Sequence, residues 1–126
     1  MKVLTVLVPT YNVEKYLRRC LDSLLLPEVL EEIEVLVVND GSKDGSADIA
    51  RAYEKKYPQT VVFVDKENGG HGSTINVGIE KAQGTYFKVL DSDDWVNIGD
   101  FIEFVKRLKE ETADAVRCPG TDQQLF

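Results

Sequence analysis

The sequence has few of the residues that covalent or metal cross-links require. Cys20 and Cys118 are its two cysteines, and His71 is its one histidine. Two distant cysteines are too few for a disulfide framework or a zinc site. Cys20 falls at the spacing of a helix core, so we expect it to be buried. The composition therefore excludes the small disulfide-rich and zinc-stabilised classes of protein.

Basic residues and long apolar runs are also scarce. The 126 residues include 15 Lys and Arg against 22 Asp and Glu, a formal net charge of −7. Such a chain gains little from nucleic-acid phosphates or anionic lipid, so both are poor partners. Pro9 and Asn12 break the N-terminal apolar run, which predicts neither a signal peptide nor a membrane-spanning helix. We expect one cytoplasmic domain over residues 1–126, with peripheral attachment to the inner face of the membrane left open for a longer form.

The apolar residues alternate between short runs and helical spacing. Short β-branched runs predict strands at residues 3–8, 33–38, 61–64 and 85–90, with a fifth candidate at 115–118. Helical spacing predicts a first helix capped by Asn12, a second capped by Ser46, a third with Ile79 on its buried side and Gly84 as a left-handed C-cap, and a fourth over residues 101–108. This alternation predicts an α/β fold, with a mostly parallel sheet covered by helices on both faces.

Polar residues follow three of the predicted strands. They are residues 10–12 after the first, Asp40 and Ser42 after the second, and residues 91–94 after the fourth. The carboxyl ends of parallel strands share one edge of a sheet, where ligands bind in a crevice. The convergence predicts a site at that edge, and the alternative is a set of solvated turn residues.

The segment Asp91-Ser92-Asp93-Asp94 places three carboxylates within four residues. Their mutual repulsion must be offset by a positive charge or by raised pKa values. Carboxylates without histidine or thiolate neighbours favour a hard cation, Mg²⁺ or Mn²⁺. The alternative is an acidic turn that only caps the helix near Ile98.

Residues 40–45 superficially resemble a calcium-binding loop. Arg51 stands where the bidentate glutamate is required, and a strand precedes the loop where a helix should. The segment is better interpreted as a turn at the end of a strand. Asp40 then points into the crevice, where it can accept an N–H from a base or sugar, and Asp44 or Ser46 begins a helix.

Residues 68–73 are rich in glycine, which lets the backbone approach a ligand closely. They lead into a helix whose N-terminus favours an anion. The lysine of a P-loop and the spacing of a dinucleotide fingerprint are both missing. A flexible surface turn is the alternative, and His71 is either a contact for phosphate or acceptor or simply solvated.

Five motifs in order carry a resemblance to a known family. They are Val8-Pro9-Thr10-Tyr11-Asn12, Val38-Asn39-Asp40-Gly41-Ser42 with Asp44 and Ser46, Asn68-Gly69-Gly70, Asn76-Val77-Gly78, and Leu90-Asp91-Ser92-Asp93-Asp94. Together they make almost the whole chain resemble the nucleotide-sugar-binding portion of a family-2 glycosyltransferase with the GT-A fold.

The resemblance implies inverting, metal-dependent transfer of a sugar from a nucleoside-diphosphate sugar, most often a UDP-sugar, to an acceptor hydroxyl. The acceptor would be a carbohydrate or lipid-linked molecule, as in cell-surface polysaccharide biosynthesis. By resemblance, Asp40 accepts the base N–H, and Asp91 contacts the ribose and joins Asp93 in binding Mn²⁺ or Mg²⁺. The implied nucleotide-binding residues are Pro9, Thr10, Tyr11, Asp40, Ser42, Asn68, Gly69, Gly70, Asn76 and Asp91.

The chain departs from the family pattern in two ways. Ile75 stands where members commonly carry an arginine, which leaves His71 or Lys88 as candidate diphosphate contacts. Members are also commonly longer, so we expect a chain truncated before the acceptor-binding half, with the catalytic base beyond Phe126. Two other interpretations are a sugar nucleotidyltransferase and a receiver-like Mg²⁺-binding signalling module. They require a basic glycine-rich loop or paired acids, respectively, after the first strand, and residues 9–11 provide neither.

Overall fold

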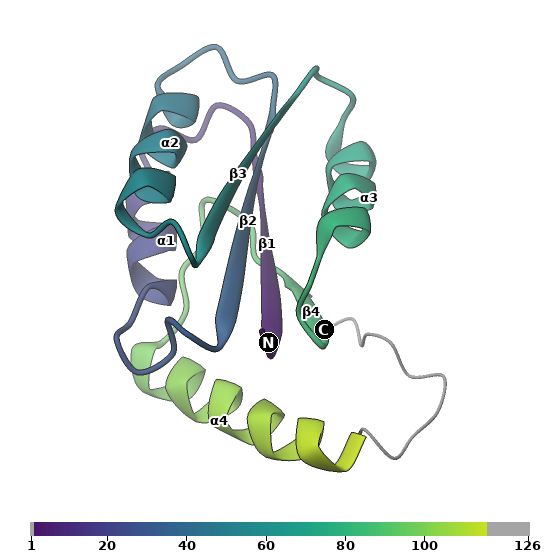
Figure 1. Ribbon diagram of the computed structural model, residues 1–126. Coiled ribbons are helices and arrows are strands. Elements are labelled where there is room, and N and C mark those ends of the chain that lie inside the picture. The colour runs from purple at the N-terminus through teal and green to yellow at the C-terminus, as the bar shows by residue number, and fades with distance from the viewer. Residues whose placement is uncertain (1, 116–126) are drawn as a thin grey trace.

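The computed structural model describes residues 2–115, in which strands and helices alternate (Figure 1). The elements are β1 (Leu4–Thr10), α1 (Leu17–Leu24), β2 (Ile33–Asp40), α2 (Ser46–Lys56), β3 (Val61–Lys66), α3 (His71–Lys81), β4 (Tyr86–Val89) and α4 (Ile98–Ala115). The predicted α/β alternation is confirmed. Of the predicted fifth strand at 115–118, Ala115 instead ends α4, and the other three residues lie outside the described part of the chain.

The sheet has the order β3-β2-β1-β4, and every neighbouring pair is parallel. Leu4 of β1 pairs with Ile33 on one side and with Tyr86 on the other. The chain therefore runs outward from β1 to β3 and then returns to the other side of β1. This change of direction lies between β1 and β4, where a parallel sheet forms its ligand crevice.

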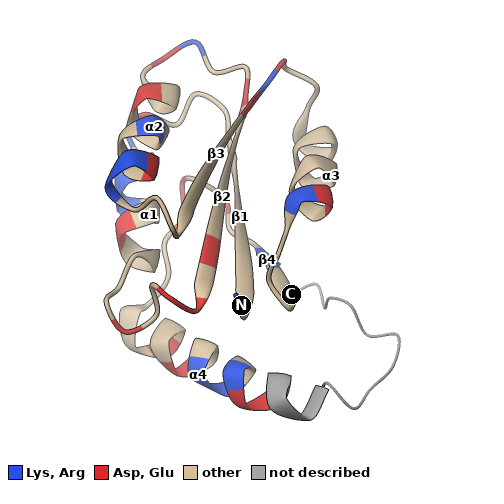
Figure 2. Ribbon diagram, viewed as in Figure 1, with Lys and Arg blue, Asp and Glu red and all other residues tan. Residues whose placement is uncertain are grey.

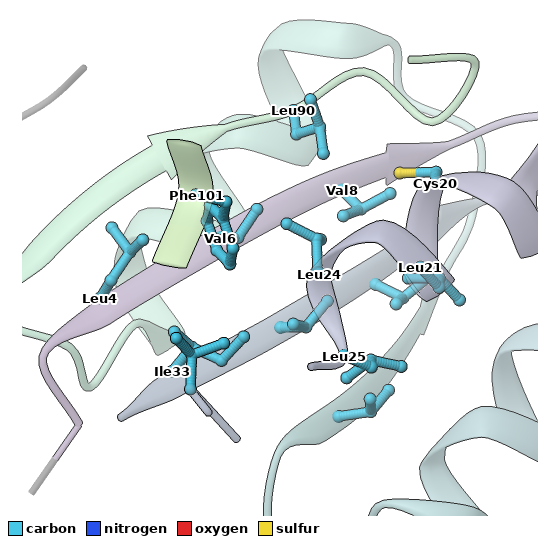
Figure 3. Close-up of a cluster of buried hydrophobic side chains, with 14 of the residues drawn as sticks. Leu4, Val6, Val8, Cys20, Leu21, Leu24, Leu25, Ile33, Leu90 and Phe101 are labelled. Carbon is cyan, nitrogen blue, oxygen red and sulfur yellow. The ribbon is translucent and has the colours of Figure 1, made fainter. Parts of the chain in front are cut away.

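Alternate residues of β1 face opposite layers of helices. Leu4, Val6 and Val8 belong to the core that the sheet shares with α1, α2 and α4 (Figure 3). Leu7 belongs to the second core, beneath α3, which covers the other face of the sheet (Figure 1). Because both faces are covered, β1 and β2 are buried along their whole length. Double burial explains why these strands are continuous apolar runs in the sequence.

Helix α1 begins later than predicted, at Leu17. Asn12 does not cap it. Asn12 adopts a left-handed φ of 51°, and its side-chain oxygen accepts the N–H of Lys43 at 2.8 Å. A short polar side chain tolerates this backbone conformation. Asn12 therefore joins two loops instead of starting a helix.

The predicted cap of α2 is also wrong. Gly45 occupies the N-cap position, and the Ser46 hydroxyl accepts the N–H of Val13 at 3.0 Å. The Asp44 carboxylate accepts the N–H of Ser46 at 3.0 Å, so Asp44 provides the polar contact at the helix start.

Two predictions about the third helix fail because the chain packs so tightly there. A Cβ at Gly78 would lie 2.6 Å from a Leu7 methyl carbon, so α3 presents this narrow side to the sheet. Ile79 is rotated away and is 46% exposed, not buried. Gly84 has no left-handed φ and is not a C-cap. A Cβ there would lie 2.5 Å from the backbone nitrogen of Thr5, so its role is close approach to β1.

Candidate functional site

A cleft of about 720 Å³ lies at the carboxyl edge of the sheet, where β1 and β2 end and the segment after β4 begins. The predicted site residues that line it are Pro9, Thr10, Tyr11, Asp40, Asn68, Gly70, Asp91 and Asp93. Val13, His71, Thr74 and Ser92 complete the lining. The fold thus brings together residues that are as much as 84 positions apart, from Pro9 to Asp93.

Three predicted site residues do not line this cleft. Ser42 borders a neighbouring pocket, and its hydroxyl accepts the N–H of Asn12 at 3.0 Å. Gly69 is outside the lining, and its N–H donates to the Asp40 carboxylate at 2.8 Å. Asn76 is exposed on α3. The structure therefore places Ser42 and Gly69 in supporting contacts and leaves Asn76 outside the lining.

The Asp40 carboxylate, at the end of β2, is 8% exposed and accepts three hydrogen bonds. Its Oδ1 accepts from Lys66 Nζ at 2.7 Å and from the Gly69 N–H at 2.8 Å, and its Oδ2 accepts from the Gly70 N–H at 3.0 Å. Burial raises the pKa of Asp40, but the Lys66 hydrogen bond and the two backbone N–H groups lower it more. The net pKa lies below its usual range, so Asp40 is an ionised, acceptor-only group near neutral pH.

The glycine loop (residues 68–70) is held in place by the same aspartate. Besides the two N–H contacts, the Asn68 side-chain amide donates to the Asp40 carbonyl oxygen at 3.1 Å. Gly70 adopts a φ of 91°, which favours glycine, and forms the N-cap of α3. His71 begins the helix and lines the cleft. The loop therefore directs the N-terminus of α3 at the cleft, an arrangement that favours an anion.

The end of β1 provides an apolar and aromatic wall. Thr10 is buried, and its hydroxyl donates to the Val8 carbonyl at 3.1 Å. Tyr11, the next residue, is 49% exposed beside the cleft. Pro9 extends the strand beyond the predicted boundary. It follows the residues that pair with β4, at Leu4–Leu7, where one side of β1 has lost its neighbour and a proline is tolerated.

Two loops beside this wall are joined by five hydrogen bonds between residues 12–14 and residues 42–46. The Asp44 carboxylate accepts the Glu14 N–H at 3.1 Å, and the Glu14 carboxylate accepts the Gly45 N–H at 2.6 Å. Burial raises the pKa of Asp44, but hydrogen bonds from Ser46 and Glu14 lower it more, so the net shift is downward. These contacts fix the ends of β1 and β2 relative to each other.

The acidic turn (residues 91–94) follows β4. Asp91, Asp93 and Asp94 are exposed, and one carboxylate oxygen from each lies within 4.8 Å of the others. The Asp94 N–H donates to the Asp91 carbonyl at 2.9 Å, which closes the turn. A set of carboxylate oxygens, without nitrogen or sulfur ligands, fits a hard divalent cation. The residues present are therefore able to hold Mg²⁺ or Mn²⁺.

Helix α1 contacts the acidic turn and the residues that follow it. The Ser23 hydroxyl accepts the Val96 N–H at 3.1 Å, and the Cys20 thiol donates to the Asp91 carbonyl at 3.8 Å. Burial and then the carboxylates of the acidic turn raise the pKa of Cys20 to about 12, so the thiol stays protonated. The Arg19 guanidinium stacks 3.8 Å from the centre of the Trp95 ring. Contacts from one helix thus hold the start of the turn and the two residues that follow it.

Sequence reasoning missed Lys66 and Ser23. Lys66 stands two residues before Asn68, and its position as a cation beside the glycine segment was the one local signal available. Nothing local marks Ser23, because its partner Val96 is 73 residues away. Lys66 acts by contacting Asp40, which a motif identifies, whereas Ser23 contacts Val96, two residues after the last motif.

Ile75, in α3, stands where the family pattern commonly has an arginine. Ile75 is half-buried and packs against the hydrophobic cluster beneath α3. Of the two candidates to replace an arginine there, His71 lines the cleft and Lys88 does not. Lys88 lies in β4 opposite Val6. The structure therefore favours His71.

Figure 2 shows that the charged residues lie mainly on helices and loops and that the strands are largely uncharged. Among residues 2–115, no helix is long and apolar enough to cross a membrane.

The sequence matches the family described as "Glycosyl transferase family 2" over residues 5–122. Among curated relatives, it is 39% identical over 112 residues to "Glycosyltransferase GlyA" of Streptococcus pneumoniae serotype 4, covering 88% of this chain and 16% of that protein. The chain therefore spans about a sixth of that relative.

Two solved structures show the same arrangement. Residues 1–349 of S. aureus TarS, in complex with UDP-GlcNAc, align with a TM-score of 0.69 at 34% identity, covering 92% of this chain and 31% of that one. The mannosyltransferase PcManGT from Pyrobaculum calidifontis, in complex with GDP-Man and Mn²⁺, aligns with a TM-score of 0.72 at 27% identity. The alignment covers 82% of this chain and 31% of that one. These are GT-A glycosyltransferases, so the predicted fold is confirmed.

Proposed function

Because the chain belongs to glycosyl transferase family 2, we propose that it is the donor-binding part of an inverting, metal-dependent glycosyltransferase. The enzyme would transfer a sugar from a nucleoside-diphosphate sugar, with uridine the expected nucleoside, to a hydroxyl of a carbohydrate or lipid-linked acceptor. The observation that carries the proposal is the cleft itself. It places an ionised carboxylate, a helix N-terminus and an acidic turn along one edge of a parallel sheet.

The nucleotide base would lie at the end of the cleft that β1 and β2 form. Tyr11 is exposed there and offers an aromatic face to a planar base. Pro9 and Thr10 form the floor beside it. Asp40 would accept a base N–H, for which its ionised carboxylate is suited. Asp91, across the cleft after β4, would contact the ribose.

The diphosphate would lie between the N-terminus of α3 and the acidic turn. The helix start favours negative charge, and His71 is positioned to contact a phosphate oxygen. Asp93, with Asp91, would hold Mn²⁺ or Mg²⁺. A bound divalent cation supplies Lewis-acid stabilisation of the departing nucleoside diphosphate.

The acceptor hydroxyl needs a general base in order to attack the sugar. The carboxylates that line this cleft are Asp40, Asp91 and Asp93, and each has a role toward the donor in this proposal. We infer that this general base comes from another part of the full-length protein. The chain would then bind donor without transferring the sugar.

Isothermal titration calorimetry of the chain with UDP, in Mn²⁺ and then in EDTA, tests the proposal. We expect binding in Mn²⁺ and a large loss of affinity in EDTA. Circular dichroism should show the same folded chain in both buffers. A folded chain that binds no nucleoside diphosphate in Mn²⁺ contradicts the proposed function, and equal affinity in EDTA contradicts the metal dependence.

A further inference from the structure

The hydrogen bonds of Asp40 leave little of its carboxylate free. Two carboxylate oxygens offer about four acceptor positions. Lys66 Nζ and the Gly69 N–H take both positions on Oδ1, at 2.7 and 2.8 Å. The Gly70 N–H takes one position on Oδ2, at 3.0 Å. One acceptor position therefore remains, on Oδ2.

Lys66 is the side chain that limits the free acceptor positions of this carboxylate. Asp40 and Gly70 line the cleft, whereas Lys66 and Gly69 contact Asp40 without lining it. Because both positions on Oδ1 are taken, the acceptor position left for a ligand lies on Oδ2. Removal of the Lys66 donor would open a second position, on Oδ1.

Lys66 is firmly held in this place. Its side chain is 15% exposed, and its ammonium also donates to the Glu67 carbonyl at 2.7 Å. Two short hydrogen bonds thus hold the ammonium. The occupied state of Oδ1 is therefore part of the folded chain.

We infer that Lys66 is a specificity-determining residue for the nucleotide base, because it limits Asp40 to one acceptor and so selects a base with one N–H on its pairing edge. The inference rests on the proposed function. Uracil presents a single N–H between two carbonyls, which one acceptor satisfies. Guanine presents two adjacent N–H donors, of which one would be left without a partner. Cytosine also presents one donor, its amino N–H, but the unprotonated ring nitrogen beside that group is repelled by the carboxylate.

Inosine diphosphate provides a sharp comparison in the unmodified protein. Its base differs from guanine by the absence of the exocyclic amino group, so it presents one N–H where guanine presents two. An unpaired donor weakens binding by about tenfold. In Mn²⁺, we expect calorimetry to show that IDP binds about tenfold more tightly than GDP, and that UDP binds more tightly than GDP and CDP.

Substitution of Lys66 tests whether this residue sets the preference. Lys66→Met keeps the length of the side chain and removes the donor, which frees a position on Oδ1. We expect the IDP-to-GDP and UDP-to-GDP affinity ratios to fall toward one. Lys66→Arg retains a cationic donor and should keep both ratios. Lys55→Met, on the exposed surface of α2, is the matched control and should change nothing.

The outcomes separate this inference from the proposed function. If the wild-type chain binds GDP as tightly as IDP, Asp40 does not discriminate by donor count and the inference is wrong, while donor binding stands. A folded Lys66→Met variant with wild-type ratios also overturns it. If that variant does not fold, the IDP and GDP comparison in the wild-type chain decides. If no nucleoside diphosphate binds, the proposed function fails and the inference fails with it.

Discussion

The two acidic regions of the cleft balance their negative charge in different ways. Asp40 is 8% exposed and forms an ion pair with Lys66 at 2.7 Å, supported by two backbone N–H groups. The carboxylates of the acidic turn are exposed and form no ion pair with any Lys or Arg among residues 2–115. At the Asp40 end of the cleft, the chain itself therefore supplies the groups that balance the negative charge. The end at the acidic turn concentrates charge that an added cation would balance.

The comparison predicts that Asp40 contributes more to the stability of the chain than any carboxylate of the acidic turn. Asp40→Ala leaves the Lys66 ammonium and the Gly69 and Gly70 N–H groups without their acceptor. We expect the free energy of unfolding at pH 7 to fall by about 3 kcal/mol, measured by urea denaturation. Uridine binding should also weaken in the variant that remains folded. A loss confined to the diphosphate portion of the ligand would contradict the contact with the base.

The same variant has a defined pH dependence. The pKa of Asp40 is lower in the folded chain than in the unfolded one, so its stabilisation is complete above about pH 4 and is lost as the pH falls through the folded value. The difference in stability between the wild type and Asp40→Ala should therefore narrow below about pH 4. A difference that stays constant down to pH 2 would show that the carboxylate charge is not its source.

The acidic turn should show the opposite behaviour. Asp93→Ala removes one carboxylate from a set that repels itself, so we expect unchanged or slightly higher stability. Affinity for UDP in Mn²⁺ should fall by about 100-fold, since the cation loses a charged ligand. Calorimetry and urea denaturation measure the two effects, with Glu110→Ala, on the exposed side of α4, as the control. Unchanged affinity would remove Asp93 from metal binding, and a stability loss as large as that of Asp40→Ala would erase the difference between the regions.

A smaller effect tests how the acidic turn is positioned. Ser23→Ala removes the acceptor of the Val96 N–H at 3.1 Å and leaves the three carboxylates intact. We expect a loss of about 1 kcal/mol in stability, together with weaker Mn²⁺-dependent UDP binding. Binding measured in EDTA should not change. If Mn²⁺-dependent affinity is also unchanged, Ser23 supports the fold and does not position the turn.

Local pattern was sufficient for β1 to β4 and for the location of the cleft, although it wrongly extended a fifth strand to Ala115. Buried parallel strands are continuous apolar runs, and polar residues such as Asp40 and Asp91 stand where these runs have ended. Because parallel strands share their carboxyl edge, the convergence of these residues follows from the order of elements along the chain. The breaks in the sequence thus coincide with the lining of the cleft.

Contacts that depend on how the helices pack against the sheet could not be predicted from the sequence. Helical spacing placed Ile79 inward, but the small Gly78 allows α3 to approach β1 on a different side. The ion pair between Lys66 and Asp40 joins residues 26 positions apart. No local periodicity encodes such pairs, because they depend on the distance and rotation between packed elements.

The five hydrogen bonds between residues 12–14 and 42–46 have a consequence for motion. Each loop supplies both donors and acceptors to the other, so neither can open without breaking the contacts of its partner. The two loops should therefore unfold and refold together, as one cooperative unit. Any widening of the cleft on this side would then move the two loops as a single piece.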